Sequence, residues 1–172
     1  MLKIYLARSM TGRPKKEVYD EAKKERDFLR KAGFAALCPI EYEGLKKEKG
    51  IINASRSEMD SYWYRDKQAI RESHLVFNMT PHLRSDGAAH EVGYKRYHLQ
   101  GPVVHVYPTG MLPSDGAVSY LEDDYVCDSI EEAIEYTLRV HGTFWLRTKW
   151  RFNRLNRCIL KSMWYQLKEW FK

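Results

Sequence analysis

The sequence predicts a three-layer α/β protein of the flavodoxin-like or Rossmann-like kind, with an open parallel sheet of about five strands between two layers of helices. Short runs of strand-forming residues alternate with longer helix-like segments along the 172 residues, which is typical of parallel strands joined by crossover helices. Right-handed crossovers leave few topologies, and the strand order 2-1-3-4-5 fits five strands best. Hydrophobic residues at 44% and charged residues at 30% are typical of a soluble globular chain.

Five runs rich in strand-forming residues mark the expected strands. They cover residues 3–7, 34–37, 75–79 and 102–107 and a part of residues 118–126. The first run, KIYLA, alternates regularly and contains Tyr5. Residues 38–53 have no apolar period, so we expect a loop there.

Four helices are expected between and after these strands, at about 14–32, 57–72, 86–100 and 129–140. Each has a start or stop signal. The signals are Pro14 at the first position of the first helix, Gly33 after that helix, Ser55 or Ser57 before the second, Gly101 after the third, and the capping box Ser129-x-x-Glu132 at the fourth.

The composition excludes several classes of protein. No run of about eighteen apolar residues is present, so a transmembrane helix is not expected, and the first residues have no signal-peptide layout. Cys38, Cys127 and Cys158 are an odd number without paired spacing, which argues for a reducing compartment and against a disulfide framework or a zinc site. The six histidines form no metal-binding motif. We therefore expect a cytoplasmic protein that needs no metal.

The net charge of +6 is concentrated at one end of the chain. Residues 143–172 hold eight Lys or Arg and one Glu, whereas the other residues are nearly balanced, with 21 basic and 22 acidic side chains. Four of the five tryptophans lie in the same segment. We expect one globular domain at 1–142 and a basic, tryptophan-rich helical tail at 143–172.

The expected tail helix is basic on one side and largely apolar on the other. The basic stripe consists of Arg147, Arg151, Arg154, Lys161 and Lys168, and the apolar residues are Trp145, Phe152, Leu155, Ile159, Met163 and Trp170. Such a helix could pack on the body or on a sister subunit, lie on an anionic membrane surface, or bind single-stranded nucleic acid. We favour packing, then the membrane surface, then nucleic acid.

Ligands of open parallel sheets bind beyond the carboxyl ends of the strands, where the strand order reverses. Within the expected ligand edge, the segment 85–94, SDGAAHEVGY, is the most informative. Gly87, Ala88 and Ala89 leave the backbone open to close approach by a ligand. Glu91 lies in the first or second turn of the expected helix, where the helix dipole favours an ionised carboxylate. Such a carboxylate can attack the anomeric carbon of a sugar. The alternative is a glutamate that only stabilises the helix start.

Asp66 supplies a second carboxylate on the preceding helix. Met59, Trp63, Asp66 and Ile70 share one stripe of this helix, so Asp66 interrupts an apolar face. A carboxyl group there needs a partner or must keep its proton. A protonated carboxyl could act as general acid toward a departing base. The alternative is an aspartate paired with a nearby Arg or Lys.

The segment 8–13, RSMTGR, follows the first strand and precedes a helix. Its hydroxyls, two guanidinium groups and the helix N-terminus make a reasonable cradle for an anion or a phosphate. It is neither a Walker A loop nor a GxGxxG fingerprint, so binding of ATP or a dinucleotide is not supported. An ordinary surface loop is the alternative.

Taken together, these segments resemble the nucleoside 2-deoxyribosyltransferase superfamily, which includes transferases and nucleotide N-glycosidases. The match covers roughly residues 3–107, and four features carry it in order. They are KIYLA with Tyr5, then Arg65-Asp66-x3-Ile70-x2-Ser73, then Gly87-x3-Glu91-x-Gly93-Tyr94, and finally Gly101-Pro102-Val103-Val104.

The resemblance implies roles for several residues. Glu91 would be the nucleophile or electrostatic stabiliser at C1′, Asp66 would lie near the base, and Tyr5 would hold the catalytic carboxylate. The substrate-binding residues would be Arg8, Ser9, Met10, Gly12, Arg13, Ser85, Asp86 and Gly87. The implied reaction needs no metal or redox cofactor, and the implied assembly is a homodimer or larger homo-oligomer with sites near subunit interfaces.

One departure from the family pattern favours the hydrolase branch. Transferases of free nucleosides usually carry Asp six residues before the catalytic Glu, where this chain has Ser85 and places Asp86 one residue later. The nucleoside 5′-monophosphate hydrolases similarly carry Ser there, and a neutral hydroxyl tolerates a phosphate dianion that a carboxylate would repel. We therefore expect a nucleotide N-glycosidase. A transferase is the first alternative, and a non-catalytic nucleotide-binding module, targeted by its tail, is the second.

Overall fold

Five parallel strands form one sheet, and the computed structural model of the chain describes residues 1–10, 13–41, 56–83, 85–107 and 125–142. The strands are β1 (Lys3–Ala7), β2 (Ala35–Leu37), β3 (Leu75–Asn78), β4 (Val103–Val106) and β5 (Tyr125–Cys127). Their order in the sheet is β2-β1-β3-β4-β5, and all four pairings are parallel. The predicted order 2-1-3-4-5 is confirmed. Every predicted strand is present, although β5 begins only at Tyr125 within the described residues.

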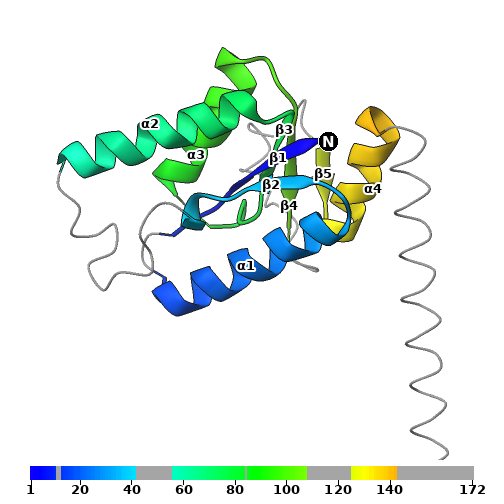
Figure 1. Ribbon diagram of the computed structural model, residues 1–172, viewed down its shortest axis with the longest axis horizontal. Coiled ribbons are helices and arrows are strands. Elements are labelled where there is room, and N and C mark those ends of the chain that lie inside the picture. Colours follow the sequence, from blue (N-terminus) through cyan, green and yellow to red (C-terminus); the bar gives the residue numbers. More distant parts are fainter. Residues whose placement is uncertain (11–12, 42–55, 84, 108–124, 143–172) are drawn as a thin grey trace, which may run out of the picture. The chain divides into compact units, whose positions relative to one another are not determined.

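Helices cover both faces of this sheet (Figure 1), with α2 and α3 together on one face and α1 on the other. The described helices are α1 (Lys15–Lys31), α2 (Arg56–Glu72), α3 (Asp86–Gly93) and α4 (Ile130–His141), with short helical turns η1 (Pro39–Glu41) and η3 (Tyr94–His98). This arrangement confirms the three-layer α/β fold.

Strand β1 lies in the middle of the core because four of its consecutive side chains, Ile4 to Ala7, are fully buried. Successive side chains of a strand point to opposite faces, and a strand covered on both faces reads as a continuous hydrophobic run. Tyr5 and Ala7 pack in one cluster with Ile70 of α2 and Val92 of α3. The face of the sheet beneath α2 and α3 is therefore the face to which Tyr5 points.

Two predicted helix ends are confirmed. Gly33 follows α1 with a φ of 95°, a conformation that glycine adopts without strain. Ser129 caps α4, because its hydroxyl accepts a hydrogen bond of 3.2 Å from the Glu132 backbone N–H. The reciprocal bond of the expected capping box is displaced by one residue, since Glu132 accepts from the Asp128 N–H at 3.1 Å.

The third predicted helix needs a correction near its end. We expected one helix over 86–100, but α3 ends at Gly93 and continues as a π-helical turn, η3. This turn directs Lys95 inward, where its Nζ donates to the carbonyl oxygen of Ser73 at 2.6 Å, just beyond the end of α2. Burial lowers the pKa of Lys95. Position 101 then requires glycine, because a Cβ there would lie 2.4 Å from Cε of Lys95.

Several expectations fall on residues outside the described ranges. They concern residues 42–53 of the loop expected at 38–53, Gly12, the start of the fifth strand, Cys158 and the whole tail at 143–172. The chain forms two compact units, Met1–Ile134 and Glu135–Lys172, and the predicted boundary at 142 stays a prediction. Within the described ranges Cys38 and Cys127 are free and buried. No helix described in the structure is long and apolar enough to cross a membrane.

Candidate active site

The hydroxyl of Tyr5 lies between two buried carboxyl groups. Its oxygen is 2.8 Å from Oε1 of Glu91 and 3.1 Å from Oδ1 of Asp66. Tyr5 is fully buried, and both carboxyl residues are 5% exposed. Burying two carboxyl groups is costly unless hydrogen bonds compensate, so these contacts mark a specific polar arrangement inside an otherwise apolar layer.

Three elements that are distant in sequence bring these side chains together. Tyr5 belongs to the middle of β1, Asp66 to α2 and Glu91 to α3. Asp66 precedes Ile70 by one helical turn, and Glu91 precedes Val92, so each carboxyl neighbours a residue of the cluster that contains Tyr5. The packing of α2 and α3 on β1 therefore fixes the polar group as well as the apolar one.

Asp66 had two expected settings, and the structure gives it a tyrosine partner. The predicted stripe from Met59 to Ile70 is buried only in its second half, because Met59 is half exposed while Asp66 and Ile70 are buried. We had considered pairing with an Arg or Lys as the plain alternative. One contact of Asp66 is with the hydroxyl of Tyr5, which is a neutral partner.

Proton counting constrains the pair of contacts. A phenol has one proton, so its donation to Glu91 leaves only its oxygen lone pairs for Asp66. Both contacts are full hydrogen bonds in that case when Asp66 carries a proton, and equally when Glu91 carries the proton and the phenol donates to Asp66. Two carboxyl groups that share one partner in a buried site favour a single protonated member.

Glu91 lies in the second turn of α3, and the acidic residue in the first turn is Asp86. The free N–H groups of a helix belong to its first turn, and the effect of the helix dipole falls off within it. Dipole stabilisation therefore applies better to Asp86 than to Glu91. The side chain of Glu91 points inward to Tyr5, so it is more than a surface residue that stabilises the helix start.

The start of α3 is open to a ligand. Ser85 caps the helix, accepting a bond of 3.3 Å from the Ala88 N–H, while Asp86 and Gly87 are exposed. A Cβ at Gly87 would meet no atom closer than Oγ of Ser85, at 3.9 Å. Packing within the described residues therefore does not explain this glycine.

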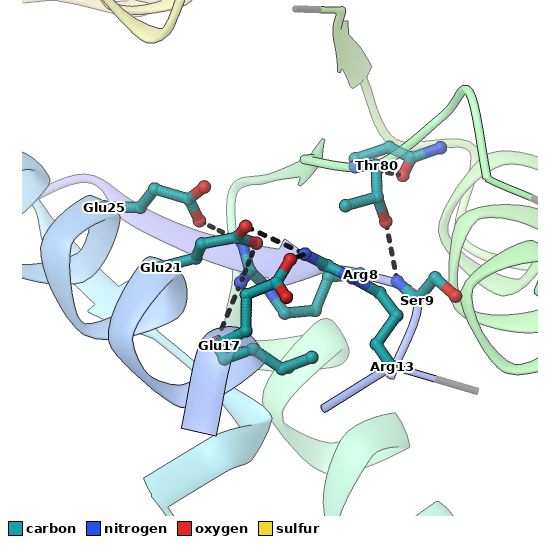
Figure 2. A network of polar contacts seen from close by, with 9 residues as sticks. Arg8, Ser9, Arg13, Glu17, Glu21, Glu25 and Thr80 are labelled. Atoms are coloured by element: carbon teal, nitrogen blue, oxygen red, sulfur yellow. Dashed lines mark hydrogen bonds and ion pairs between the residues drawn. The ribbon is translucent and has the colours of Figure 1, made fainter. Parts of the chain in front are cut away.

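The loop that follows β1, residues 8–13 (the strand-1 loop), is hydrogen-bonded to the segment that follows β3. The Ser9 N–H donates to Oγ1 of Thr80 at 2.6 Å, and the Thr80 N–H donates to Oδ1 of Asn78 at 3.4 Å. Figure 2 shows Ser9 and Thr80 facing each other across this contact. The segment 8–13 and the residues after β3 that lead to α3 are thus neighbours at the carboxyl edge of the sheet.

The two arginines of this loop point elsewhere. Arg8 and Arg13 make ion pairs with glutamates of α1 (Figure 2). Helix α1 lies on the other face of the sheet from α2 and α3 (Figure 1). The structure thus brings Tyr5, Asp66 and Glu91 together but places both guanidinium groups against α1. Met10 is half-buried, and Gly12 lies outside the described residues.

Asn78 and His105 are polar residues of this edge that sequence reasoning missed. Nδ2 of Asn78 is 3.2 Å from Nδ1 of His105, and the pair links β3 to β4. By strand alternation they share the face of Val76 and Val103, which pack with Tyr5. A polar residue near the end of an otherwise apolar strand run, in LVFNM and in PVVHVY, is the sequence signal that could have identified them. Among the residues that the structure describes, no group of three His, Cys, Asp or Glu side chains could hold a metal ion.

The fold and the site define an α/β protein with two buried carboxyl groups at the strand 1–strand 3 switch point, and solved structures with this fold are known. A 2-deoxyribosyltransferase from Bacillus psychrosaccharolyticus is 25% identical, with a TM-score of 0.50, over 69% of this chain and 82% of that chain. A conserved protein from Enterococcus faecalis V583 is 17% identical, with a TM-score of 0.54, over 78% of this chain and 96% of that one, and shows the fold alone. No protein-family model and no curated protein sequence matches.

The first likeness supports the resemblance found in the sequence. It supports the nucleoside 2-deoxyribosyltransferase superfamily as the class of this protein, and it supports the expectation that the protein is an enzyme.

Proposed function

We propose that this protein cleaves the N-glycosidic bond of a nucleoside 5′-monophosphate, with 2′-deoxyribose as the expected sugar, and releases the base. The observation that carries the proposal is the Tyr5 hydroxyl, 2.8 Å from Glu91 and 3.1 Å from Asp66 in a buried site. Paired carboxyl groups with different protonation states are the machinery that glycosidic bond cleavage requires. The fold shared with a 2-deoxyribosyltransferase supports the substrate class.

Glu91 is the group that acts at C1′. An ionised carboxylate forms a bond to C1′, or stabilises the positive charge that develops there, while the bond from C1′ to the base nitrogen breaks. The hydrogen bond from Tyr5 fixes the orientation of this carboxylate without neutralising it. Water then attacks C1′ and gives a proton to the carboxylate that protonated the base, which leaves the free sugar phosphate and an ionised Glu91.

Asp66 supplies the proton for the departing base. The base leaves with the electron pair of the broken bond, so protonation stabilises it. Hydrogen-bond counting around Tyr5 allows one protonated carboxyl group, and the proposal assigns that proton to Asp66. The two carboxyl groups thus have opposite tasks: Glu91 is needed ionised and Asp66 protonated.

The 5′-phosphate binds at the start of α3 and in the strand-1 loop. The Ser85 hydroxyl uses an acceptor lone pair for the helix cap, so its own proton is available for a phosphate oxygen. The exposed backbone at Asp86 and Gly87 adds N–H groups of the first turn, which favour anions. Ser9, Met10 and Gly12 complete this binding segment in the proposal. Arg13, which pairs with Glu17 and Glu21 in the structure, joins it only by exchanging one of these contacts for the phosphate.

A transferase is the second candidate, because the structural neighbour is a 2-deoxyribosyltransferase. The first half of the reaction would be the same, and an incoming base instead of water would take C1′. Asp86, exposed beside Ser85, could then bind the sugar hydroxyls. The two candidates differ only in the acceptor.

A panel of nucleosides and nucleoside 5′-monophosphates, each incubated with and without an acceptor base, tests the proposal. Free base without acceptor, from monophosphates in preference to nucleosides, is the expected result. Exchange that requires an acceptor identifies a transferase. Glu91→Gln should abolish base release while nucleotide binding, measured by calorimetry, persists. If the wild type releases no base from any compound yet binds nucleotides, the protein is a binding module and the enzymatic proposal is wrong.

We further propose a cytoplasmic homo-oligomer whose tail, residues 143–172, packs on the body or on a sister subunit. Deleting the tail should then change the number of subunits per particle, measured by sedimentation, or lower the free energy of unfolding. Binding of the full chain to anionic vesicles, lost on deletion, would instead assign the tail to a membrane surface. Oligonucleotide binding lost in the same way would assign it to nucleic acid.

A further inference from the structure

Three glutamates and two arginines form an alternating row of ion pairs along α1 (Figure 2). Glu17, Glu21 and Glu25 are spaced by four residues, so they lie on one side of the helix. Nη2 of Arg13 is 2.7 Å from Glu17 and 2.8 Å from Glu21. Arg8 contacts the other oxygen of Glu21 at 3.7 Å and makes a close ion pair with Glu25.

Arg8 is the buried member of this row. Its side chain is fully buried, and Nη1 also donates to the carbonyl oxygen of Val18 at 3.2 Å. A guanidinium removed from water needs ion pairs and hydrogen bonds to compensate for its lost hydration. The planar fork of arginine can meet Glu21, Glu25 and this carbonyl together, which the single ammonium of a lysine cannot.

The backbone around Arg8 is held in place at three consecutive residues. Ala7 packs with the α2 and α3 cluster, whereas the next side chain, Arg8, reaches α1 on the other face of the sheet. The following residue, Ser9, donates its N–H to Thr80. Three consecutive residues are therefore held by three different parts of the fold, at the point where β1 turns into the strand-1 loop.

We propose that Arg8 is a positioning residue that holds the strand-1 loop against α1 through Glu21 and Glu25, and that it does not touch the substrate. The kinetic part of this inference rests on the proposed function. The opposite reading, in which Arg8 binds the phosphate, also has a structural basis. Nε of Arg8 and Nη1 of Arg13 are buried and have no hydrogen-bond partner among the described residues.

Two variants, one at each end of the ion pair between Arg8 and Glu25, distinguish the two interpretations. Arg8→Lys keeps the positive charge but loses the fork, and Glu25→Gln removes a negative charge with little change in shape. If Arg8 positions the loop, both variants weaken the reaction. If Arg8 is a phosphate ligand, Glu25→Gln removes a competing anion and should strengthen phosphate binding. Asp20→Asn, an exposed change of the same charge on α1, is the matched control.

The first readout is kcat/KM for a nucleoside 5′-monophosphate. We expect Arg8→Lys and Glu25→Gln each to lower it by about five-fold to fifty-fold, the range expected when a binding loop is misplaced, and Asp20→Asn to leave it within about two-fold. The double variant should have a kcat/KM no lower than that of the less active single variant, because both changes break the same contact. A Glu25→Gln variant with a lower KM than the wild type would overturn the inference.

The second readout needs no turnover. Hydrogen exchange at the Ser9 amide, measured by NMR and referenced to the amide of Leu6 in the middle of β1, reports whether the loop stays fixed. Exchange at Ser9 should accelerate at least about ten-fold in Arg8→Lys and Glu25→Gln and stay unchanged in Asp20→Asn. Unchanged exchange in all three variants refutes the positioning role, whatever the reaction is. Accelerated exchange in a protein that releases no base leaves the positioning role standing and contradicts only the proposed function.

Discussion

The hydroxyl oxygen of Tyr5 lies 2.8 Å from Oε1 of Glu91, although the two residues are 86 positions apart in the sequence. This contact joins the interior strand β1, which lies between β2 and β3, to the helix α3 that borders the ligand edge. Because the tyrosine ring is part of the apolar cluster, its hydroxyl has little freedom to move. The orientation of Glu91 is therefore set by the core of the protein.

Replacing Tyr5 with Phe should lower kcat by about ten-fold to a hundred-fold and change KM much less, because Glu91 loses the donor that orients it. The ring is retained, so the apolar packing persists. The folded state should still lose about 1–3 kcal/mol from the buried carboxyl groups left without the phenol. Steady-state kinetics and urea unfolding measure the two effects. Tyr97→Phe, at an exposed tyrosine of η3, is the control, and an unchanged kcat in Tyr5→Phe would contradict the assigned role.

Asp66→Asn tests the proton donor. Asparagine preserves the shape of the side chain but cannot give a proton to the base. The loss in kcat should be large for substrates whose base leaves poorly without a proton, and small for analogues whose base is a stable anion. Comparing the variant across a series of such bases gives the dependence on leaving-group pKa. The same loss for every base would show that Asp66 has only a structural part.

Much of this site could be placed from the sequence, because its signals are local. The KIYLA run, the carboxylate on the apolar stripe of α2 and the Gly-x3-Glu element of α3 each belong to one segment. The parallel-sheet rule places β1 beside β3. That Tyr5 would meet a carboxylate came from the resemblance to a family, since no spacing rule predicts a contact between β1 and α3.

The arginines show where local reasoning stops. In the sequence, Arg8 and Arg13 flank a loop beside an expected ligand, which favours an anion cradle. In the structure, the stripe of glutamates on α1 competes for both guanidinium groups. Lys95 is similar, because its partner is a carbonyl beyond the end of α2, 22 residues away. Both outcomes depend on how helices pack on the sheet, and the sequence pattern of one segment does not contain that information.

Gly87→Ala separates a packing role of this glycine from a binding role. A Cβ there would meet nothing closer than 3.9 Å, so the fold should keep its stability or gain up to about 1 kcal/mol from helix propensity. If the substrate approaches this backbone, KM should rise several-fold. Gly93→Ala, in the same helix and with an equally open Cβ position, is the control. A variant with unchanged KM would place the substrate away from the start of α3.

Gly101→Ala should destabilise the protein by roughly 1–3 kcal/mol, since the new Cβ would overlap the buried stem of Lys95. Lys95 cannot move away freely because its Nζ is bonded to the carbonyl of Ser73. Shortening the lysine removes the overlap, so Gly101→Ala should cost less in a Lys95→Ala background than in the wild type. Urea unfolding of the two single variants and the double variant measures this coupling. Additive effects would mean that the two side chains do not meet.

Glu25 links the ion-pair row to pH. Loss of hydration on burial raises the pKa of Glu25 from about 4.5 to about 7, and the lowering effect of Arg8 does not outweigh it. Between these two pH values the folded state binds more protons than the unfolded state, so stability falls as pH rises. Relative to Glu25→Gln, which does not titrate, the wild type should lose up to about 3 kcal/mol of unfolding free energy between pH 4.5 and pH 7.5. Urea unfolding of both proteins across this range tests the sign, because the titration of all other groups cancels in the difference. A wild type that gains stability over Glu25→Gln as pH rises would mean that attraction to Arg8 exceeds the cost of burial, and that the pKa of Glu25 is lowered on folding.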